Sequence, residues 1–182
     1  MCLDRVEKNY ADRVAVEWKS FLLRPYAEEK DLDAFRHYTQ SWSKPAGQEG
    51  GGRFRPWSTD EAPPSHSVPP NVAVKAAARQ GAFGRYHLAL MDAYFYDNRN
   101  VTAVDTILDV ARAGELDMER FQTDLADPAL VEAVAADHNE AVARGVTGVP
   151  AVVAGDGFMI PGSQEERVYG DVIERMLAKG LV

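Results

Sequence analysis

The sequence predicts an α/β protein that is interrupted by a large all-helical insertion. Residues 13–23, RVAVEWKSFLL, begin with alternating apolar and polar residues, a pattern typical of a β-strand. Residues 71–145 read as nearly continuous helix, and residues 150–161 form two short apolar runs joined by Gly155-Asp156-Gly157, a triplet suited to a hairpin. Strand, helical block, then strand, turn, strand and helix together indicate one α/β layer with an inserted helical domain.

Helices are expected before the first strand and after the last. Leu3, Val6 and Tyr10 have the spacing of one helix face, so residues 3–11 are expected to end a helix. Ser163 and Glu166 have the spacing of a capping box, which predicts that the final helix opens at Ser163.

The insertion has its own start and stop signals. Asp31 is a candidate cap for a helix over residues 31–42, and a long loop rich in Gly and Pro follows it. Asp127 followed by Pro128 predicts the start of another helix, and Gly145 predicts its end. We therefore predict an α/β domain made of residues 1–26 and 140–182, with a helical insertion domain over residues 27–139.

Composition excludes several classes of function. The chain has 182 residues and a formal net charge of −8, whereas nucleic acids and anionic membrane surfaces require a basic patch. Its apolar runs are shorter than the roughly 20 residues that cross a bilayer, and the charged N-terminus is no secretory signal, so we expect a cytoplasmic protein. One cysteine and scattered histidines predict no internal disulfide and no metal site.

Pro150 occupies an unusual position, directly before the apolar run AVVA. Proline has no backbone N–H and is normally kept out of strand interiors. The residues alone allow two interpretations: a trans proline that begins an edge strand, or a proline with a purpose of its own.

Three stretches identify the family that this chain resembles: RVAVEWKSFLLRP, AVKAAARQGAFGRYHLALMDAYF and ARGVTGVPAVVAGDGFMIPGSQ. They resemble DsbA-family thioredoxin-like proteins, in the branch of FrnE-type dithiol–disulfide isomerases and 2-hydroxychromene-2-carboxylate isomerases. The resemblance implies a thioredoxin-like fold, N-terminally truncated, with a helical domain inserted into it.

The same resemblance implies a substrate site around Pro150. The Val149–Pro150 bond would be cis, as it is beside the redox centre of the family, and the backbone N–H and C=O of Val149 would pair with an extended substrate. Thr147 belongs to the same loop. Gly162 and Ser163 are expected to open a helix, where their N–H groups could receive a carboxylate such as that of glutathione.

Cys2 is the one candidate for the catalytic thiol. Family members carry C-x-x-C at the N-terminus of their first helix, where the helix dipole lowers the thiol pKa. Cys2 stands too close to Val14 to match that position, so an incidental small residue is the alternative. Either Met1 is an internal methionine, with the motif upstream of it, or the chain is short and borrows a strand from a partner, for example in a homodimer.

Three functions follow from the resemblance. The first is a thiol–disulfide oxidoreductase or isomerase of DsbA type that acts on a peptide or a small thiol or disulfide. The second is a glutathione-dependent isomerase of the 2-hydroxychromene-2-carboxylate type, with glutathione as cosubstrate and no other cofactor. The third is a non-catalytic module that binds a peptide or partner protein.

Overall fold

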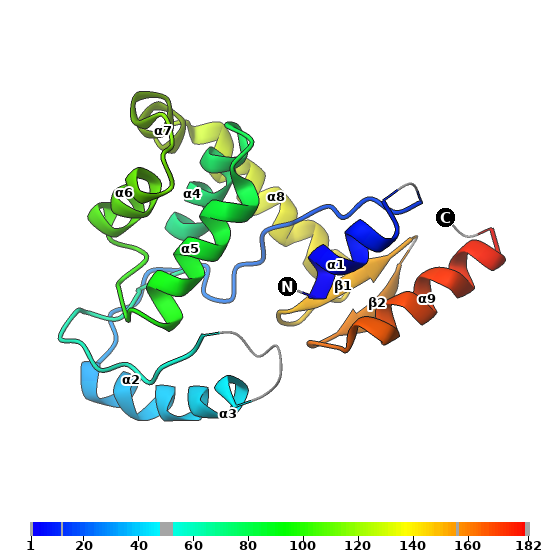
Figure 1. The fold of residues 1–182 in the computed structure, drawn as a ribbon. Helices are drawn as coiled ribbons and strands as arrows, with labels where there is room; N and C mark the ends of the chain where they lie inside the picture. Colours follow the sequence, from blue (N-terminus) through cyan, green and yellow to red (C-terminus); the bar gives the residue numbers. More distant parts are fainter. Residues whose placement is uncertain (1, 12, 48–52, 156, 181–182) are drawn as a thin grey trace. The chain divides into compact units, whose positions relative to one another are not determined.

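The computed structural model describes residues 2–11, 13–47, 53–155 and 157–180, without the side chains of Cys2, Asp4, Pro45 and Ala46. The chain forms two compact units (Figure 1). Unit 1 consists of Met1–Phe21 and Asp137–Val182, and unit 2 is Leu22–Ala136. The sequence-based domain boundaries, at 26/27 and 139/140, stay a prediction.

The regular secondary structure of unit 2 is entirely helical in the part that the structure describes. It contains α2 (Leu32–Thr39), a 3-10 turn (Gln40–Trp42), α3 (Ser43–Ala46), α4 (Val68–Ala78), α5 (Phe83–Phe95), α6 (Val104–Ala113), α7 (Met118–Leu125) and the first part of α8 (Pro128–Ala143). Tyr86 and Phe121 are fully buried in its main core, with ring centroids 5.4 Å apart. A second cluster, around Phe35, Trp42 and Trp57, packs α2 against the segment that follows α3.

Aspartate caps start these helices as the sequence predicted. The Asp31 carboxylate accepts a hydrogen bond from Ala34 N at 2.8 Å, and Asp127 accepts one from Ala129 N at 3.0 Å. Each bond satisfies an N–H that has no partner inside its own helix. Asp117 caps α7 in the same way, through Arg120 N.

Unit 1 contains α1 (Cys2–Asn9), the strands β1 (Ala151–Ala154) and β2 (Phe158–Pro161), and α9 (Glu166–Ala178). The strands pair antiparallel, with Ala151 opposite Pro161 and Ala154 opposite Phe158, so the predicted hairpin is confirmed. Val6 of α1, Ile160 of β2 and Tyr169 of α9 form the buried centre, and Figure 1 shows both helices alongside the hairpin.

The strand predicted over residues 13–23 is wrong. Residues 14–22 have no regular secondary structure, and the described sheet contains only β1 and β2. The N–H groups of Arg13 and Val14 bind Tyr10 O, and Ser20 N donates to the Asp137 carboxylate at 2.9 Å. Alternating apolar residues make a strand only where a neighbouring strand supplies a ladder of hydrogen bonds, and the described residues supply none here.

The predicted start of the last helix is also wrong. Helix α9 begins at Glu166 with Glu165 as its N-cap, so Ser163 does not form a capping box. Glu166 instead accepts hydrogen bonds from Arg5 at 2.7 Å and Asn9 at 3.0 Å, which tie α9 to α1.

Candidate functional site

The end of α8 fixes where the candidate site begins. Gly145 has a φ of +82°, a conformation that costs an L side chain about 1–2 kcal/mol. Its N–H donates to Val142 O and the N–H of Val146 donates to Ala141 O, both at 2.9 Å. These two bonds form a Schellman motif, which ends the helix and turns the chain. Val146 is buried, so the loop that follows starts from an anchored residue.

Residues 147–150 form an exposed loop between that anchor and β1. Thr147, Val149 and Pro150 are exposed, and 49% of Val149 is accessible to solvent. The Val149–Pro150 peptide bond is cis. Because the first pair of the ladder is Ala151 with Pro161, Val149 lies outside the backbone pairing of the hairpin. The backbone bends at residues 148–150, directly before the strand.

Gly162 and Ser163 lie next to this loop but not as the sequence predicted. The N–H of Gly162 donates to Pro150 O at 2.9 Å, so it closes the hairpin and is not free for a ligand carboxylate. Ser163 is exposed and stands before the start of α9, and therefore outside the helix N-terminus that was expected to bind an anion. Whether Ser163 contacts a substrate stays a prediction.

Tyr169 is a supporting residue that the sequence interpretation missed. It is buried in the centre of unit 1, and its hydroxyl accepts a hydrogen bond from Gln164 N at 3.2 Å. The Gln164 side chain also donates to Pro161 O at 2.9 Å. These contacts hold the backbone between β2 and α9. The spacing of Tyr169 with Val172 and Met176 on one helix face was the available signal.

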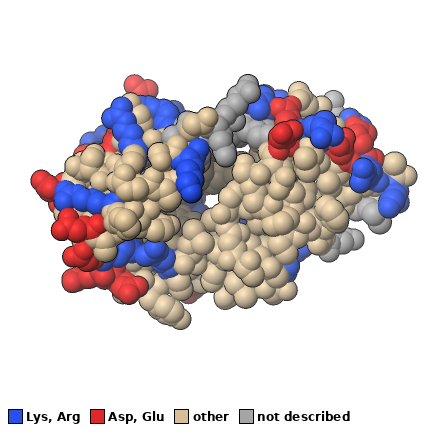
Figure 2. Space-filling model, turned by 90° about the horizontal axis from the view of Figure 1, so that it is seen from below, with Lys and Arg blue, Asp and Glu red and all other residues tan. Residues whose placement is uncertain are grey.

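The loop and the hairpin themselves contain almost no charged residues. Residues 145–164 contain one charged residue, Asp156, which lies outside the described residues. Figure 2 shows a broad tan area on the right, in unit 1, with charged side chains gathered at its edge. A loop and hairpin with so few charged residues suit an apolar segment better than an anion.

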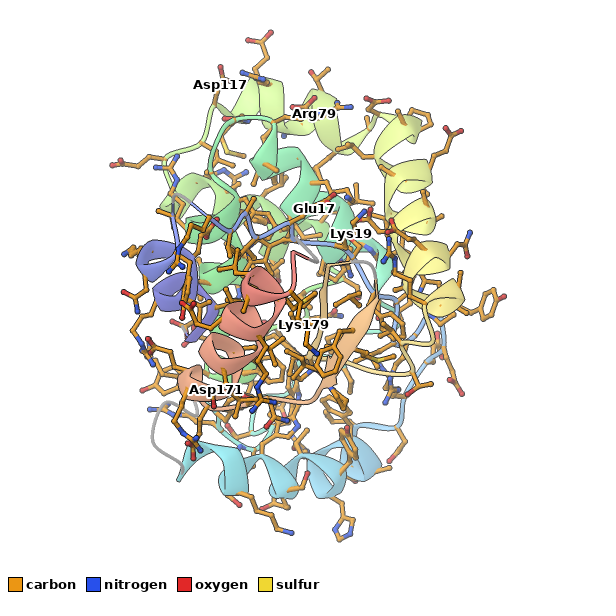
Figure 3. The ribbon with its side chains drawn as sticks, turned by 90° about the vertical axis from the view of Figure 1, so that its right-hand side faces the viewer. Glu17, Lys19, Arg79, Asp117, Asp171 and Lys179 are labelled. Atoms are coloured by element: carbon orange, nitrogen blue, oxygen red, sulfur yellow. The ribbon has the colours of Figure 1, made fainter. Side chains whose placement is uncertain are left out.

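Two basic side chains, Arg144 near the end of α8 and Lys19, are paired with one carboxylate of α8. Arg144 contacts Glu140 at 3.0 Å, and Lys19 contacts the same carboxylate at 2.6 Å. Lys19 also lies 3.2 Å from Glu17, its neighbour in Figure 3. The hydrogen bond from Lys19 is the largest cause that lowers the pKa of Glu140. These groups stay charged and paired. The ion pair between Lys19 and Glu140 therefore holds the segment around Lys19 against α8.

Cys2 is the candidate catalytic thiol. The one cysteine, Cys2, begins α1, and its side chain lies outside the described part of the chain. Its role as a catalytic residue stays a prediction. Within the described residues, no three His, Cys, Asp or Glu side chains come together as a metal site would require.

A family model described as the DSBA-like thioredoxin domain matches residues 1–174. The chain belongs to this family. Its fold is therefore a DsbA-like thioredoxin fold with a helical insertion, as the sequence predicted, and the family includes thiol–disulfide oxidoreductases.

Curated relatives match only part of their own length. The chain is 27% identical over 149 residues to the ClpXP adapter protein SpxH of Bacillus subtilis, covering 76% of this chain and 49% of that protein. SpxH of Bacillus licheniformis is 27% identical over 115 residues, covering 59% of this chain and 38% of that protein. The chain thus spans about half or less of these relatives.

Solved structures share the fold across nearly the whole chain. A candidate protein disulfide isomerase from Nitrosomonas europaea aligns with a TM-score of 0.78 at 13% identity, covering 98% of this chain and 89% of that chain. A probable DsbA oxidoreductase from Streptomyces coelicolor aligns with a TM-score of 0.70 at 24% identity, covering 97% and 83%. The cytosolic disulfide reductase DsbM from Pseudomonas aeruginosa has a TM-score of 0.58 at 20% identity, covering 87% and 82%.

None of the helices in the described part of the chain is both long and apolar enough to cross a bilayer.

Proposed function

We propose that this chain carries the substrate-binding half of a thiol–disulfide oxidoreductase. An extended polypeptide binds along residues 147–150 and pairs with the backbone of Val149. The observation that carries this proposal is the position of Val149, which is 49% exposed and lies outside the ladder, between the buried Val146 and an apolar strand. Extended peptide ligands bind proteins through main-chain hydrogen bonds of this kind.

The chemistry is thiol–disulfide exchange. A thiolate attacks one sulfur of a disulfide, a new S–S bond forms, and the old bond breaks to release a second thiolate, which takes up a proton. This chain contributes one thiol, Cys2, so completing a dithiol cycle needs a second thiol, which glutathione could provide as cosubstrate. The similarity to a cytosolic reductase agrees with the cytoplasmic setting that we propose.

A peptide is preferred here over glutathione as the occupant of the loop. Glutathione carries two carboxylates, which would need cationic partners or free N–H groups. The N–H of Gly162 is bound to Pro150 O, and Arg144, which shortly precedes the loop in the sequence, is paired with Glu140, as is Lys19. The glutathione-dependent isomerase is therefore the weaker of the two enzymatic alternatives.

A second candidate function is a non-catalytic binding module. Two observations favour it: the sequence contains one cysteine, and the curated relatives carry the name of an adapter protein. This module would use the same loop, with a partner protein as the occupant. Insulin reduction by dithiothreitol separates the candidates. The oxidoreductase accelerates it and loses that activity in Cys2→Ser, whereas the binding module leaves the rate unchanged.

Peptide binding tests the loop itself. We expect Val149→Ser to weaken binding of alkylated insulin B chain about threefold to tenfold, because about 1 kcal/mol of apolar contact is lost. Isothermal titration calorimetry measures this change. Phe158→Ser is the matched control: it removes an apolar side chain of similar exposure, 58%, from the opposite end of the same hairpin. Equal losses in both variants would contradict the assignment.

A further inference from the structure

A cluster of two arginines and a tyrosine lies in unit 2, and its members are Arg53, Arg55 and Tyr96. The guanidinium carbon of Arg53 is 3.6 Å from the centroid of the Tyr96 ring, and that of Arg55 is 3.7 Å away. Arg55 also donates a hydrogen bond to the Tyr96 hydroxyl. A guanidinium stacked on an aromatic ring keeps N–H groups along its edge for another acceptor.

The backbone presents Arg55 from a fixed position. Its N–H donates to Phe95 O at 2.7 Å, at the end of α5, and its C=O accepts from the Asn98 side chain at 3.3 Å. The rings of Phe54 and Phe95 pack with centroids 4.7 Å apart. A side chain that is already stacked and anchored loses less freedom when it binds a ligand.

Charge around the cluster is unevenly distributed. Arg53 forms an ion pair with Asp92 at 3.0 Å, whereas Arg55 forms no ion pair with a carboxylate in the described part of the chain. A hydrogen bond from Arg53 and the charge of Arg55 lower the pKa of Tyr96, while burial and Asp97 oppose this shift. Two guanidinium groups thus lie against one ring in a chain whose formal net charge is −8.

We propose that the cluster of Arg53, Arg55 and Tyr96 binds the phosphoryl group of a small phosphate monoester. Guanidinium groups pair with phosphate oxygens through parallel N–H bonds, and a tetrahedral phosphoryl group offers oxygens to both arginines. The Tyr96 hydroxyl adds a donor between them. Asp92 competes for Arg53, so Arg55 provides the dominant contact. This site is separate from the proposed peptide loop and does not depend on it.

Titration with two probes tests the proposal. Inorganic phosphate and glycerol 3-phosphate are added at constant ionic strength, and NMR follows the Arg55 Nε–H and Tyr96 ring signals. We expect saturable shifts that Arg55→Gln weakens about tenfold, which is about 1.4 kcal/mol. Arg85→Gln is the matched control, because Arg85 is an exposed arginine of the same unit outside the cluster. It should leave binding unchanged.

A second variant distinguishes binding at this cluster from a general effect of the protein's net charge. Asp92→Asn should strengthen phosphate binding because it releases Arg53, while Asp105→Asn, which removes the same charge from an exposed position on α6, should not. The proposal is overturned by shifts that stay linear with added phosphate, by equal effects of Arg55→Gln and Arg85→Gln, or by acetate binding as tightly as phosphate.

Discussion

At the scale of single residues, Asn98 shows how one side chain can hold a loop. It is 1% exposed and has a φ of 54°, a left-handed conformation that asparagine tolerates better than most residues. Its Oδ1 accepts from Ser58 N at 2.9 Å, and its Nδ2 donates to Arg55 O. Its own C=O accepts from Thr59 at 2.8 Å. The long loop before α4 is therefore fastened to the end of α5.

Asn98→Ala should destabilise the protein by about 2–4 kcal/mol. The substitution leaves the part-buried N–H of Ser58 and C=O of Arg55 without their partner, which costs about 1–3 kcal/mol. It also replaces asparagine by alanine, which tolerates positive φ less well. Chemical denaturation measures the loss.

Asn98→Gly provides the control for the backbone conformation. Glycine tolerates positive φ at no steric cost, so Asn98→Gly should be less destabilising than Asn98→Ala by about 1 kcal/mol. A free energy of unfolding within about 0.5 kcal/mol of wild type for both variants would contradict the role of Asn98.

At the scale of elements, the sequence correctly predicted where a helix begins when an aspartate carboxylate caps its first turn. Asp31 and Asp127 bind the N–H groups of their own first turns, a local contact that the sequence determines directly. Ser163 failed as a cap because Glu166 is engaged with Arg5 and Asn9 of α1, far away in the chain. Contacts between residues so far apart in the sequence cannot be predicted from the local pattern of residues.

The Asp127 cap makes the stability of α8 depend on pH. The hydrogen bond from Ala129 N, followed by Arg79, lowers the pKa of Asp127 in the folded protein. A lowered folded-state pKa adds stability above the unfolded value of about 3.9, and this stability is lost as the pH falls through the lower folded-state pKa. Asp127→Ala should therefore lower the Tm at pH 7, and the difference from wild type should shrink on acidification.

Thermal unfolding monitored by circular dichroism from pH 7 to pH 2 would follow this difference. Glu132→Ala is the control, since Glu132 is an exposed carboxylate further along the same helix. A difference between Asp127→Ala and wild type that is the same at all pH values would show that the Asp127 charge is not involved.

The segment at residues 13–23 shows where a local pattern fails to predict the structure. Val14 and Val16 alternate with Ala15 and Glu17, which is the spacing that a strand requires. A strand also needs backbone partners, which the residues of one segment cannot reveal. In the structure the segment is held by side chains instead, through Ser20 N and Lys19 to Asp137 and Glu140.

At the scale of the whole molecule, the periods of the apolar residues predicted an α/β chain with an inserted helical block, whereas the family was predicted from the resemblance of three stretches. The helical block and the hairpin lie where the apolar pattern predicts them, and the last helix begins a few residues later than predicted. The candidate site was predictable only in part. Gly145 and Pro150 mark the turn and the loop, but the bond from Gly162 N to Pro150 O joins residues whose pairing depends on the register of the hairpin.

Hydrogen exchange at the Val149 amide tests the central claim of a substrate-binding loop most directly. With alkylated insulin B chain bound, the Val149 N–H should exchange at least about tenfold more slowly than in the free protein, because it would be hydrogen-bonded to the peptide. The amide of Val131, on the exposed face of α8, serves as the internal reference and should not change. Unchanged exchange at Val149 in a saturated complex would contradict the account.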